Sequence, residues 1–177
     1  LNSVISDDIG LTMKKKNLDT ILVLDFGSQD TQLIARRIRE LNVYSEILPW
    51  DIATEKIQAL SPKGVILSGG PESVTASNTP RIPEVIFELD IPILGICYGM
   101  QTLAEQFGGQ VSSSKKKEFG HAEIILEETS LLFDDLSSGS SMDVWMSHGD
   151  HVSTLPDQFN ILASTKSSPI AAMKHIE

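Results

Sequence analysis

From residue 20 onward, short apolar runs alternate with stretches in which apolar residues recur every three or four positions. Apolar runs bounded by turn residues are typical of buried parallel strands, and they fall at residues 21–25, 45–48, 64–67 and 92–96. Helical spacing is found at residues 33–41, 52–60, 82–89 and 100–107. This order predicts an α/β fold with an open, mostly parallel twisted sheet, helices on both faces and right-handed crossovers.

Charged, capping and glycine residues predict how these helices face and where they end. In the first helix, the predicted apolar face consists of Leu33, Ile34, Ile38 and Leu41, and the arginines and glutamate among residues 36–40 belong to the solvent face. Asp51 is predicted as the N-cap of the second helix. The glycines at positions 108 and 109 are predicted to close the fourth helix.

The second half of the chain has little helical periodicity. Strand-like runs separated by turn residues fall at residues 119–126, 143–147, 160–164 and 170–174, and we expect them to add antiparallel or mixed strands to the sheet edge. The lysines at 115–117 are predicted to form a solvated turn. Residues 20–177 are expected to form one domain, and residues 1–19 a loosely ordered leader or tag, in which Met13 is a candidate start.

Composition narrows the class of protein and its partners. The 177 residues are 41% hydrophobic and 21% charged, which suits one soluble globular domain. A formal charge of −10 disfavours nucleic acid and anionic membranes as partners. No apolar run approaches the ~20 residues of a membrane span, and one cysteine cannot form an internal disulfide, so a cytoplasmic location is expected. No residues have the spacing of metal ligands, so no metal is expected in this domain.

The single cysteine follows a predicted strand, where a parallel sheet binds its ligands. Gly95, Cys97 and Gly99 form a G-x-C-x-G string between strand and helix, which is a nucleophile elbow with a thiol in place of a hydroxyl. Two flanking glycines allow a turn so tight that its central residue is strained and exposed. The helix N-terminus is expected to lower the pKa of Cys97. A core cysteine would need neither glycine, so the pattern favours a nucleophile over a structural thiol.

A second glycine-rich segment, S-G-G-P-E-S at residues 68–73, follows another predicted strand. Its backbone N–H groups could hold a nucleotide phosphate, as in the S-G-G-x-D-S loop of ATP pyrophosphatases. They could also hold a developing oxyanion, or the segment could be a plain turn. Pro71 removes one donor, and residues 74–80 lack helical spacing, so we favour the oxyanion hole.

A third polar segment ends the strand-like run at residues 143–147. Ser147, His148, Gly149 and Asp150 combine a hydroxyl, an imidazole and a carboxylate in four residues. A lone histidine in a loop is usually only solvated, but these neighbours favour contact with a substrate.

Six strings carry a wider pattern: D-F-G-S-Q at 25–29, T-Q-L-I at 31–34, S-G-G-P-E-S-V at 68–74, G-I-C-Y-G-M-Q at 95–101, E-F-G at 118–120 and D-V-W-M-S-H-G-D at 143–150. Together they resemble class I (triad) glutamine amidotransferases, and within that class the glutaminase domains of GMP synthetases. The resemblance covers about residues 21–174 and implies a flavodoxin-like sheet. The elbow alone indicates only the class of amidotransferase. The first, third and last strings narrow the resemblance to the GMP synthetases within that class.

The resemblance implies that Cys97 attacks the side-chain amide of glutamine, releasing ammonia and leaving a γ-glutamyl thioester that water hydrolyses. It implies that backbone N–H groups of Gly70 and Tyr98 hold the oxyanion. The residues expected to contact glutamine are Gly69, Gln101, Ser147, His148, Gly149 and Asp150. The ammonia would aminate XMP to GMP on an ATP pyrophosphatase domain or subunit, the expected partner and the expected site of ATP and Mg. A homodimer is compatible with the resemblance for a full-length enzyme.

The sequence departs from the family in two places. Asp30 stands where members usually have tyrosine, which we interpret as a surface difference. The family's base and orienting carboxylate lie in an F-H-P-E motif, which does not occur here. His175 and Glu177 have the H-x-E spacing, but they follow residues 171–174, where the family still has the preceding strand and turn, so we reject them. We expect that the sequence stops about ten residues before its triad is complete and that it is inactive alone.

Two other functions remain open from the sequence alone. A domain that binds glutamine as a sensor without hydrolysing it would explain the missing base, but a sensor needs no strained thiol. A flavodoxin-like module that binds a phosphate ligand at Gly69 and Gly70 is disfavoured by the negative charge and by Pro71.

Overall fold

The structure, a computed structural model, describes residues 19–177, and for residues 114–118 the backbone alone. The first half forms a parallel sheet of order β2-β1-β3-β4. Its strands are β1 (Thr20–Asp25), β2 (Tyr44–Pro49), β3 (Gly64–Leu67) and β4 (Ile93–Gly95), at the positions that the sequence predicted. Its helices are α1 (Thr31–Glu40), α2 (Thr54–Leu60), α3 (Val85–Glu88) and α4 (Tyr98–Gln106). Apart from Asp19, the predicted leader lies outside the described residues.

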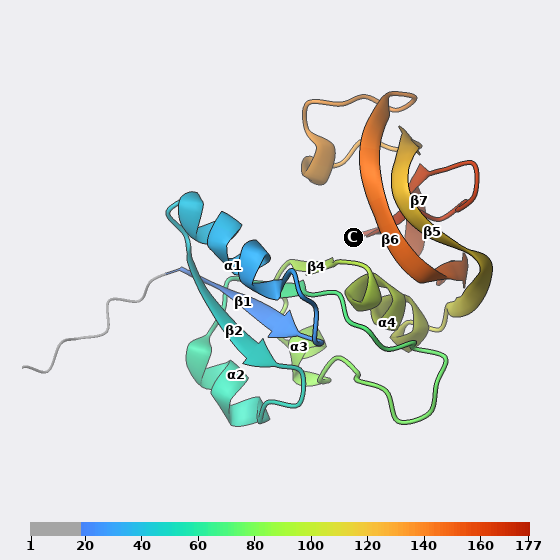
Figure 1. Ribbon diagram of the computed structural model, residues 1–177. Coiled ribbons are helices and arrows are strands. Elements are labelled where there is room, and N and C mark those ends of the chain that lie inside the picture. Colours follow the sequence, from blue (N-terminus) through green and yellow to red (C-terminus); the bar gives the residue numbers. More distant parts are fainter. Residues whose placement is uncertain (1–18) are drawn as a thin grey trace, which may run out of the picture.

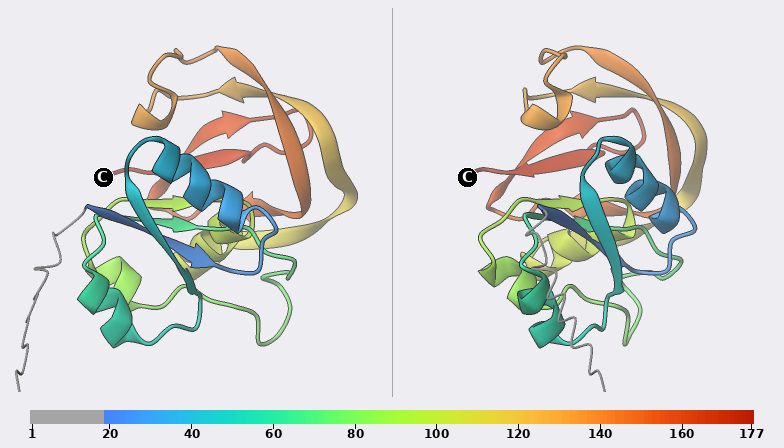
Figure 2. Two further views of the ribbon diagram at one scale, coloured as in Figure 1. Left: turned by 60° about the vertical axis from the view of Figure 1, so that its left-hand side comes forward. Right: turned by 90° about the vertical axis from the view of Figure 1, so that its left-hand side faces the viewer.

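Helices cover both faces of the parallel sheet, as predicted. α1 lies on one face, and α2 and α3 lie on the other (Figures 1 and 2). Leu22 and Leu24 are two residues apart in β1, so they point to the same face, where they pack with Ile57 of α2 and Ile86 of α3. These four side chains are at most 1% exposed. This core fixes the strand ends from which the site residues project.

The second half forms a separate sheet, so the prediction that its strands extend the edge of the parallel sheet was wrong. β5 (Gln110–Leu126), β6 (Ser141–Thr154), β7 (Phe159–Ser164) and β8 (Ala172–His175) form an antiparallel sheet of order β6-β5-β7-β8, and a 3-10 turn (Leu131–Phe133) lies between β5 and β6. α4 contacts both β5 and β6. Ala104 of α4 packs with Val152 and Ile170, which form a small core of their own. The second sheet therefore covers α4 (Figure 1).

Both long strands extend further than the sequence predicted. Residues 115–117 belong to β5 and not to a turn, and residues 147–150 lie within β6 and not in a loop. The β5 and β6 pairing shifts its register between Ser113 and Glu118, which marks an irregularity in the ladder. Polar residues occupy these stretches, and no alternation of apolar positions marked them as strand.

Three local predictions about helices were wrong. On the predicted apolar face of α1, Ile34 and Ile38 are half-buried, but Leu33 and Leu41 are 48% and 77% exposed. The smaller Ala35 is fully buried instead. α1 lies close to the sheet there, because the Ser45 hydroxyl donates to the Ala35 carbonyl oxygen over 3.0 Å. The cap of α2 is Ala53, not Asp51. α3 is shorter than the predicted 82–89, and the proline at 83 accounts for the exclusion of residue 82, because it disfavours helical backbone in the residue before it.

Candidate active site

Cys97 lies between β4 and α4 in a strained backbone conformation. Its φ is 52° and its ψ is −110°, a combination that residues with side chains rarely adopt. A Cβ atom on Gly95 would lie 2.8 Å from the Met100 nitrogen, and one on Gly99 would lie 2.5 Å from the Leu67 carbonyl oxygen. Neither space admits a side chain. Both glycines are therefore required for the strand-to-helix turn that presents the thiol.

Backbone hydrogen bonds attach this turn to the end of β3. The Ile96 N–H donates to the Leu67 carbonyl oxygen over 2.9 Å, and the Gly99 N–H donates to the Ser68 carbonyl oxygen over 3.1 Å. The cysteine turn and the glycine-rich segment that follows β3 are therefore held as one unit.

The glycine-rich segment lies directly against Cys97. A Cβ atom on Gly69 would lie 3.6 Å from the Cys97 Cβ and 3.4 Å from the Ser28 Oγ, which is ordinary contact. A Cβ atom on Gly70 would lie 2.6 Å from the Phe26 carbonyl oxygen, so only glycine fits there. The loop after β1, the loop after β3 and the elbow after β4 thus meet at one edge of the sheet, as expected for parallel strands.

Strand β6 of the antiparallel sheet lies beside Cys97. The Cys97 thiol lies 3.7 Å from the Ser147 carbonyl oxygen, to which it donates. One turn further along α4, the Gln101 side-chain amide donates to the Asp150 carbonyl oxygen over 2.8 Å. His148 lies between these two contacts on β6 and is half-buried, as is the glycine at 149. The structure therefore brings three distant segments of the predicted site together at the N-terminus of α4.

The electrostatics of the thiol differ from the sequence prediction. Burial raises the pKa of Cys97 above its usual range, the backbone N–H of Tyr98 lowers it, and the charge of Asp150 raises it. The expected depression by the helix terminus is thus outweighed by loss of water around the sulfur. In this structure the thiol is the favoured form near neutral pH.

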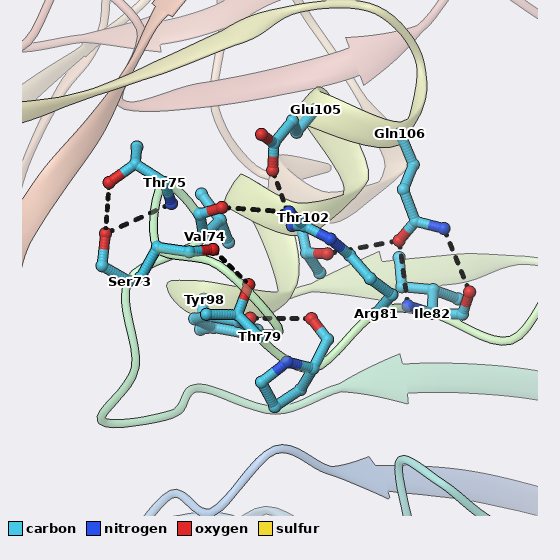
Figure 3. Close-up of polar contacts among 12 residues, drawn as sticks. Ser73, Val74, Thr75, Thr79, Arg81, Ile82, Tyr98, Thr102, Glu105 and Gln106 are labelled. Carbon is cyan, nitrogen blue, oxygen red and sulfur yellow. Dashed lines mark hydrogen bonds and ion pairs between the residues drawn. The ribbon is translucent and has the colours of Figure 1, made fainter.

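A hydrogen-bond network that the sequence did not reveal holds residues 74–82 against α4 (Figure 3). Arg81 pairs with Glu105 over 2.6 Å and donates to the Val74 carbonyl oxygen over 3.0 Å. The Gln106 side chain accepts from the Ile82 N–H over 2.9 Å and donates to the Ile82 carbonyl oxygen over 3.0 Å. These partners lie up to 24 residues apart, so no local pattern in the sequence could identify them.

The same network includes the residue after the cysteine. Tyr98 is 1% exposed, and its hydroxyl donates to the Pro80 carbonyl oxygen over 2.7 Å. Its ring also lies 5.4 Å from the ring of Phe26, centroid to centroid. Tyr98 therefore joins the start of α4 to two of the loops that surround Cys97.

His175 lies at the other end of α4 from Cys97. Its ring packs edge-on against Phe107, the C-cap of α4, and against Phe159, with centroid distances of 6.0 Å and 5.0 Å. Its Nδ1 accepts the backbone N–H of Glu177 over 3.3 Å. Nine helical residues rise about 13 Å, so the length of α4 separates this imidazole from the thiol.

The described residues include neither a metal-ligating cluster nor a membrane-spanning helix. Among residues 19–113 and 119–177, whose side chains are described, no group of three or more histidine, cysteine, aspartate and glutamate residues could hold a metal ion. No helix among the same residues is long and apolar enough to cross a membrane.

Known proteins are similar to this chain in sequence. The family model for glutamine amidotransferase class-I matches residues 22–177. The chain is 55% identical over 170 residues to the GMP synthase [glutamine-hydrolyzing] of Hamiltonella defensa subsp. Acyrthosiphon pisum, covering 92% of this chain and 32% of that protein. It is 58% identical over 159 residues to the protein of the same name from Teredinibacter turnerae, covering 86% of this chain and 30% of that protein. The chain thus spans about a third of the length of these relatives.

Solved structures of amidotransferases and their relatives have a similar fold. A protein from Thermoplasma acidophilum, provisionally named as part of a GMP synthase, matches with a TM-score of 0.74 at 32% identity, covering 90% of this chain and 79% of that one. A glutamine amidotransferase from Thermotoga maritima shares the fold with a TM-score of 0.67 at 21% identity, covering 88% of this chain and 71% of that one. The sequence strings around Cys97 and the elbow geometry fit this result. The chain belongs to the class I glutamine amidotransferase family.

Proposed function

We propose that this chain is the glutaminase part of a GMP synthase, in which Cys97 is the nucleophile. The observation that carries the proposal is the Cys97 turn, with a φ of 52° between two glycines that admit no side chain. Such strain persists only where the surrounding structure maintains it, and it clusters at functional sites. A protein that only binds glutamine would have no use for it.

The proposed reaction begins when the Cys97 sulfur forms a bond to the side-chain amide carbon of glutamine. The thiol gives up its proton, and the carbonyl oxygen becomes an oxyanion that the N–H groups of Gly70 and Tyr98 stabilise. The C–N bond then breaks, and the nitrogen leaves as ammonia after gaining a proton. Water hydrolyses the γ-glutamyl thioester to glutamate and restores the thiol.

Glutamine would bind between the Cys97 turn and strand β6. The contacts that support this placement are those of Cys97 with Ser147 and of Gln101 with Asp150, because they position β6 beside the thiol. Gly69, His148 and Gly149 complete the surface proposed to contact the substrate. The raised pKa of Cys97 implies that a base must remove its proton during attack, and the family's F-H-P-E motif would supply that base.

The ammonia would be used by an ATP pyrophosphatase domain or subunit, which would bind ATP and Mg and convert XMP to GMP. A cytoplasmic location follows from that biosynthetic role as part of the same proposal. The support is the shared name and high identity of the relatives over this chain.

The test uses the native protein in its full length. We expect it to form GMP from XMP and ATP with either glutamine or ammonia as the nitrogen source. Cys97→Ala should abolish the glutamine-dependent reaction and leave the ammonia-dependent one within about twofold, because ammonia bypasses the thiol. Undiminished glutamine-dependent synthesis by Cys97→Ala would remove the nucleophile assignment. Binding of glutamine with no turnover by the wild-type protein would favour a sensor.

A further inference from the structure

Ser68 is a fully buried serine at the junction between β3 and the glycine-rich segment. Its backbone N–H donates to the Leu24 carbonyl oxygen over 3.0 Å, and its carbonyl oxygen accepts the Gly99 N–H over 3.1 Å. Its hydroxyl oxygen accepts the Phe26 N–H over 3.0 Å. One residue therefore joins the end of β1, the end of β3 and the cysteine elbow.

The hydroxyl proton of Ser68 points to the glycine-rich segment. The hydroxyl lies 2.8 Å from the Gly69 carbonyl oxygen and 3.5 Å from the Asp25 Oδ1. That carboxylate oxygen already accepts the Gly27 N–H over 2.9 Å and the Thr31 hydroxyl over 2.7 Å. Because the bond to Gly69 is shorter and the Asp25 oxygen already accepts two other donors, the Ser68 hydroxyl donates its hydrogen bond to the Gly69 carbonyl oxygen.

This bond fixes the direction of the Gly70 N–H. The Gly69 carbonyl and the Gly70 N–H belong to one planar peptide unit, and no peptide bond among residues 19–177 is cis. In a trans peptide the C=O and N–H point in opposite directions. A hydroxyl that holds the carbonyl inward, toward Ser68, therefore holds the N–H outward. Within the described part of the chain, the Gly70 N–H donates to no protein acceptor.

Among residues 19–177, the Ser68 hydroxyl makes the only hydrogen bond to this peptide, because no other donor reaches the Gly69 carbonyl oxygen. Glycines flank it on both sides, and glycine backbone passes between conformations that other residues cannot reach. The close approach of Gly70 to the Phe26 carbonyl oxygen limits the position of its Cα but not the plane of the preceding peptide. The Ser68 hydroxyl supplies the missing constraint.

We infer that Ser68 is a positioning residue whose hydroxyl locks the Gly69–Gly70 peptide with its N–H directed at the oxyanion. The inference rests on the proposed function for its kinetic consequence, but the lock itself is a property of the fold. Ser68 is fully buried, and its hydroxyl has no hydrogen bond to the Cys97 sulfur. It acts through the backbone of the next two residues.

The kinetic test compares Ser68→Ala with the wild-type full-length protein. A donor aimed at the oxyanion acts in the transition state, so kcat for glutamine should fall while KM stays within about twofold. Complete loss of one such donor costs about 10²–10³ in kcat, and we expect a fall of at least about tenfold. GMP synthesis from ammonia should not change. A KM increase with unchanged kcat would overturn the inference.

A matched control separates the lock from ordinary stability. Ser45 is also fully buried, and its hydroxyl also donates to a backbone carbonyl, that of Ala35, on the side of the sheet covered by α1. Ser45→Ala should lower the melting temperature, though less than Ser68→Ala, because the Ser68 hydroxyl also accepts the buried Phe26 N–H. It should leave kcat unchanged. Equal loss of kcat in both variants would show that the effect is general destabilisation.

The chemistry of Cys97 provides a second control. Alkylation of the thiol by iodoacetamide passes through no oxyanion, so its rate at Cys97, followed by peptide mass spectrometry, should be the same in Ser68→Ala and wild type. A slowed alkylation would mean that the elbow itself had moved, which would overturn the inference. Ser68→Cys replaces the hydroxyl by a slightly larger thiol, which is a weaker donor. Its kcat should lie between those of wild type and Ser68→Ala, and it serves where alanine prevents folding.

A direct structural measurement does not depend on activity. Crystal structures of Ser68→Ala and wild type should show the Gly69 carbonyl rotated away from its wild-type direction in the variant. An unrotated peptide would overturn the lock even if catalysis were confirmed. Absence of glutaminase activity in wild type, together with a rotated peptide in the variant, would refute the proposed function and leave the lock established.

Discussion

The Cys97 sulfur lies 3.7 Å from the Ser147 carbonyl oxygen, so a strand of the antiparallel sheet closes the elbow that the parallel sheet builds. The S–H group can donate to this carbonyl, whereas a thiolate could not. The contact and the burial both favour the protonated thiol in the absence of substrate. The nucleophile would then be activated only when a base is in place.

The first prediction concerns the pH dependence of Cys97 reactivity. Burial is the largest cause of its raised pKa, so the thiolate fraction at pH 7 should be smaller than that of an exposed cysteine. Alkylation of Cys97 by iodoacetamide, measured without glutamine, should be slower at pH 7 than that of a cysteine in a short peptide. Its rate should still be rising at the pH where the peptide rate has levelled off. A plateau at lower pH than the peptide would contradict the prediction.

The contribution of Asp150 can be tested separately. Its negative charge raises the pKa of Cys97, so Asp150→Asn should lower that pKa and accelerate alkylation at pH 7. The bond from Gln101 goes to the backbone oxygen of Asp150 and should survive the substitution. Asp157→Asn removes an equal charge from an exposed position and should leave the rate unchanged.

A second prediction concerns the strain stored at Cys97. Alanine and glycine both remove the thiol, but only glycine adopts a φ of 52° with a ψ of −110° at little cost. Such strain costs about 1–3 kcal/mol, and the greater freedom of glycine in the unfolded chain offsets about 0.4–1 kcal/mol. Cys97→Gly should therefore be more stable than Cys97→Ala by up to about 2 kcal/mol in urea denaturation.

An exposed helical position supplies the comparison. Arg36 lies in the middle of α1, where glycine is unfavourable, and either substitution removes its pair with Glu40. Arg36→Gly should be less stable than Arg36→Ala by about 1 kcal/mol, the opposite order to that at Cys97. If alanine were the more stable residue at both positions, the elbow would carry no strain.

The sequence predicted the parallel half of the fold because each of its elements has a local signature. The apolar run at β3 is required because the strand packs on both faces of the sheet. The glycines around Cys97 are required because the turn leaves no room for side chains. The turn at Cys97 was located for the same reason, since strand, glycine and cysteine adjoin in the sequence. The contact between Cys97 and Ser147 spans 50 residues, and no direct sign of it occurs in the sequence: residue types and the family strings indicated only that both segments contact a substrate.

The antiparallel half was predicted less well for a physical reason. β5 and β6 pair mainly with each other over their length, and their outer residues are exposed, so polar and apolar side chains are both tolerated there. Trp145 and Phe119 are 78% and 67% exposed. A sequence prediction that assigns alternate apolar residues to the core would place both of these side chains inside. The hydroxyl bond of Ser68 was also missed, because the string S-G-G-P shows the glycines but not the plane of the peptide between them.

A third prediction concerns the glycine-rich segment. The position of a Cβ on Gly70, 2.6 Å from the Phe26 carbonyl oxygen, means that Gly70→Val must displace the backbone. Loss of its donor should reduce glutamine-dependent kcat by about 10²–10³ and spare the ammonia-dependent reaction. Gly64→Ala, at the start of β3, meets the end of the Ile21 side chain at 3.2 Å and the Pro92 carbonyl oxygen at an ordinary contact distance of 3.5 Å, so it serves as the control. A parallel fall in both activities of a folded Gly70→Val would assign the loop to a nucleotide site.

The last prediction concerns His175, whose spacing to Glu177 imitates a catalytic pair. Its ring packs against Phe107 and Phe159 at the end of α4 remote from Cys97, so its role in this structure is structural. His175→Ala should lower the free energy of unfolding by about 1–3 kcal/mol, because two aromatic contacts and their buried area are lost. Glutamine-dependent kcat should change less than about threefold.

His175→Phe provides the matched variant, because it keeps an aromatic ring while removing the imidazole. It should recover most of the stability lost in His175→Ala and have the kcat of wild type. A working base behaves differently: loss of a triad member costs about 10⁴–10⁶ in kcat whatever ring replaces it. A collapse of kcat in both variants, with His175→Phe as stable as wild type, would make His175 the base and would require the C-terminal strand to reach Cys97 by a rearrangement of β8.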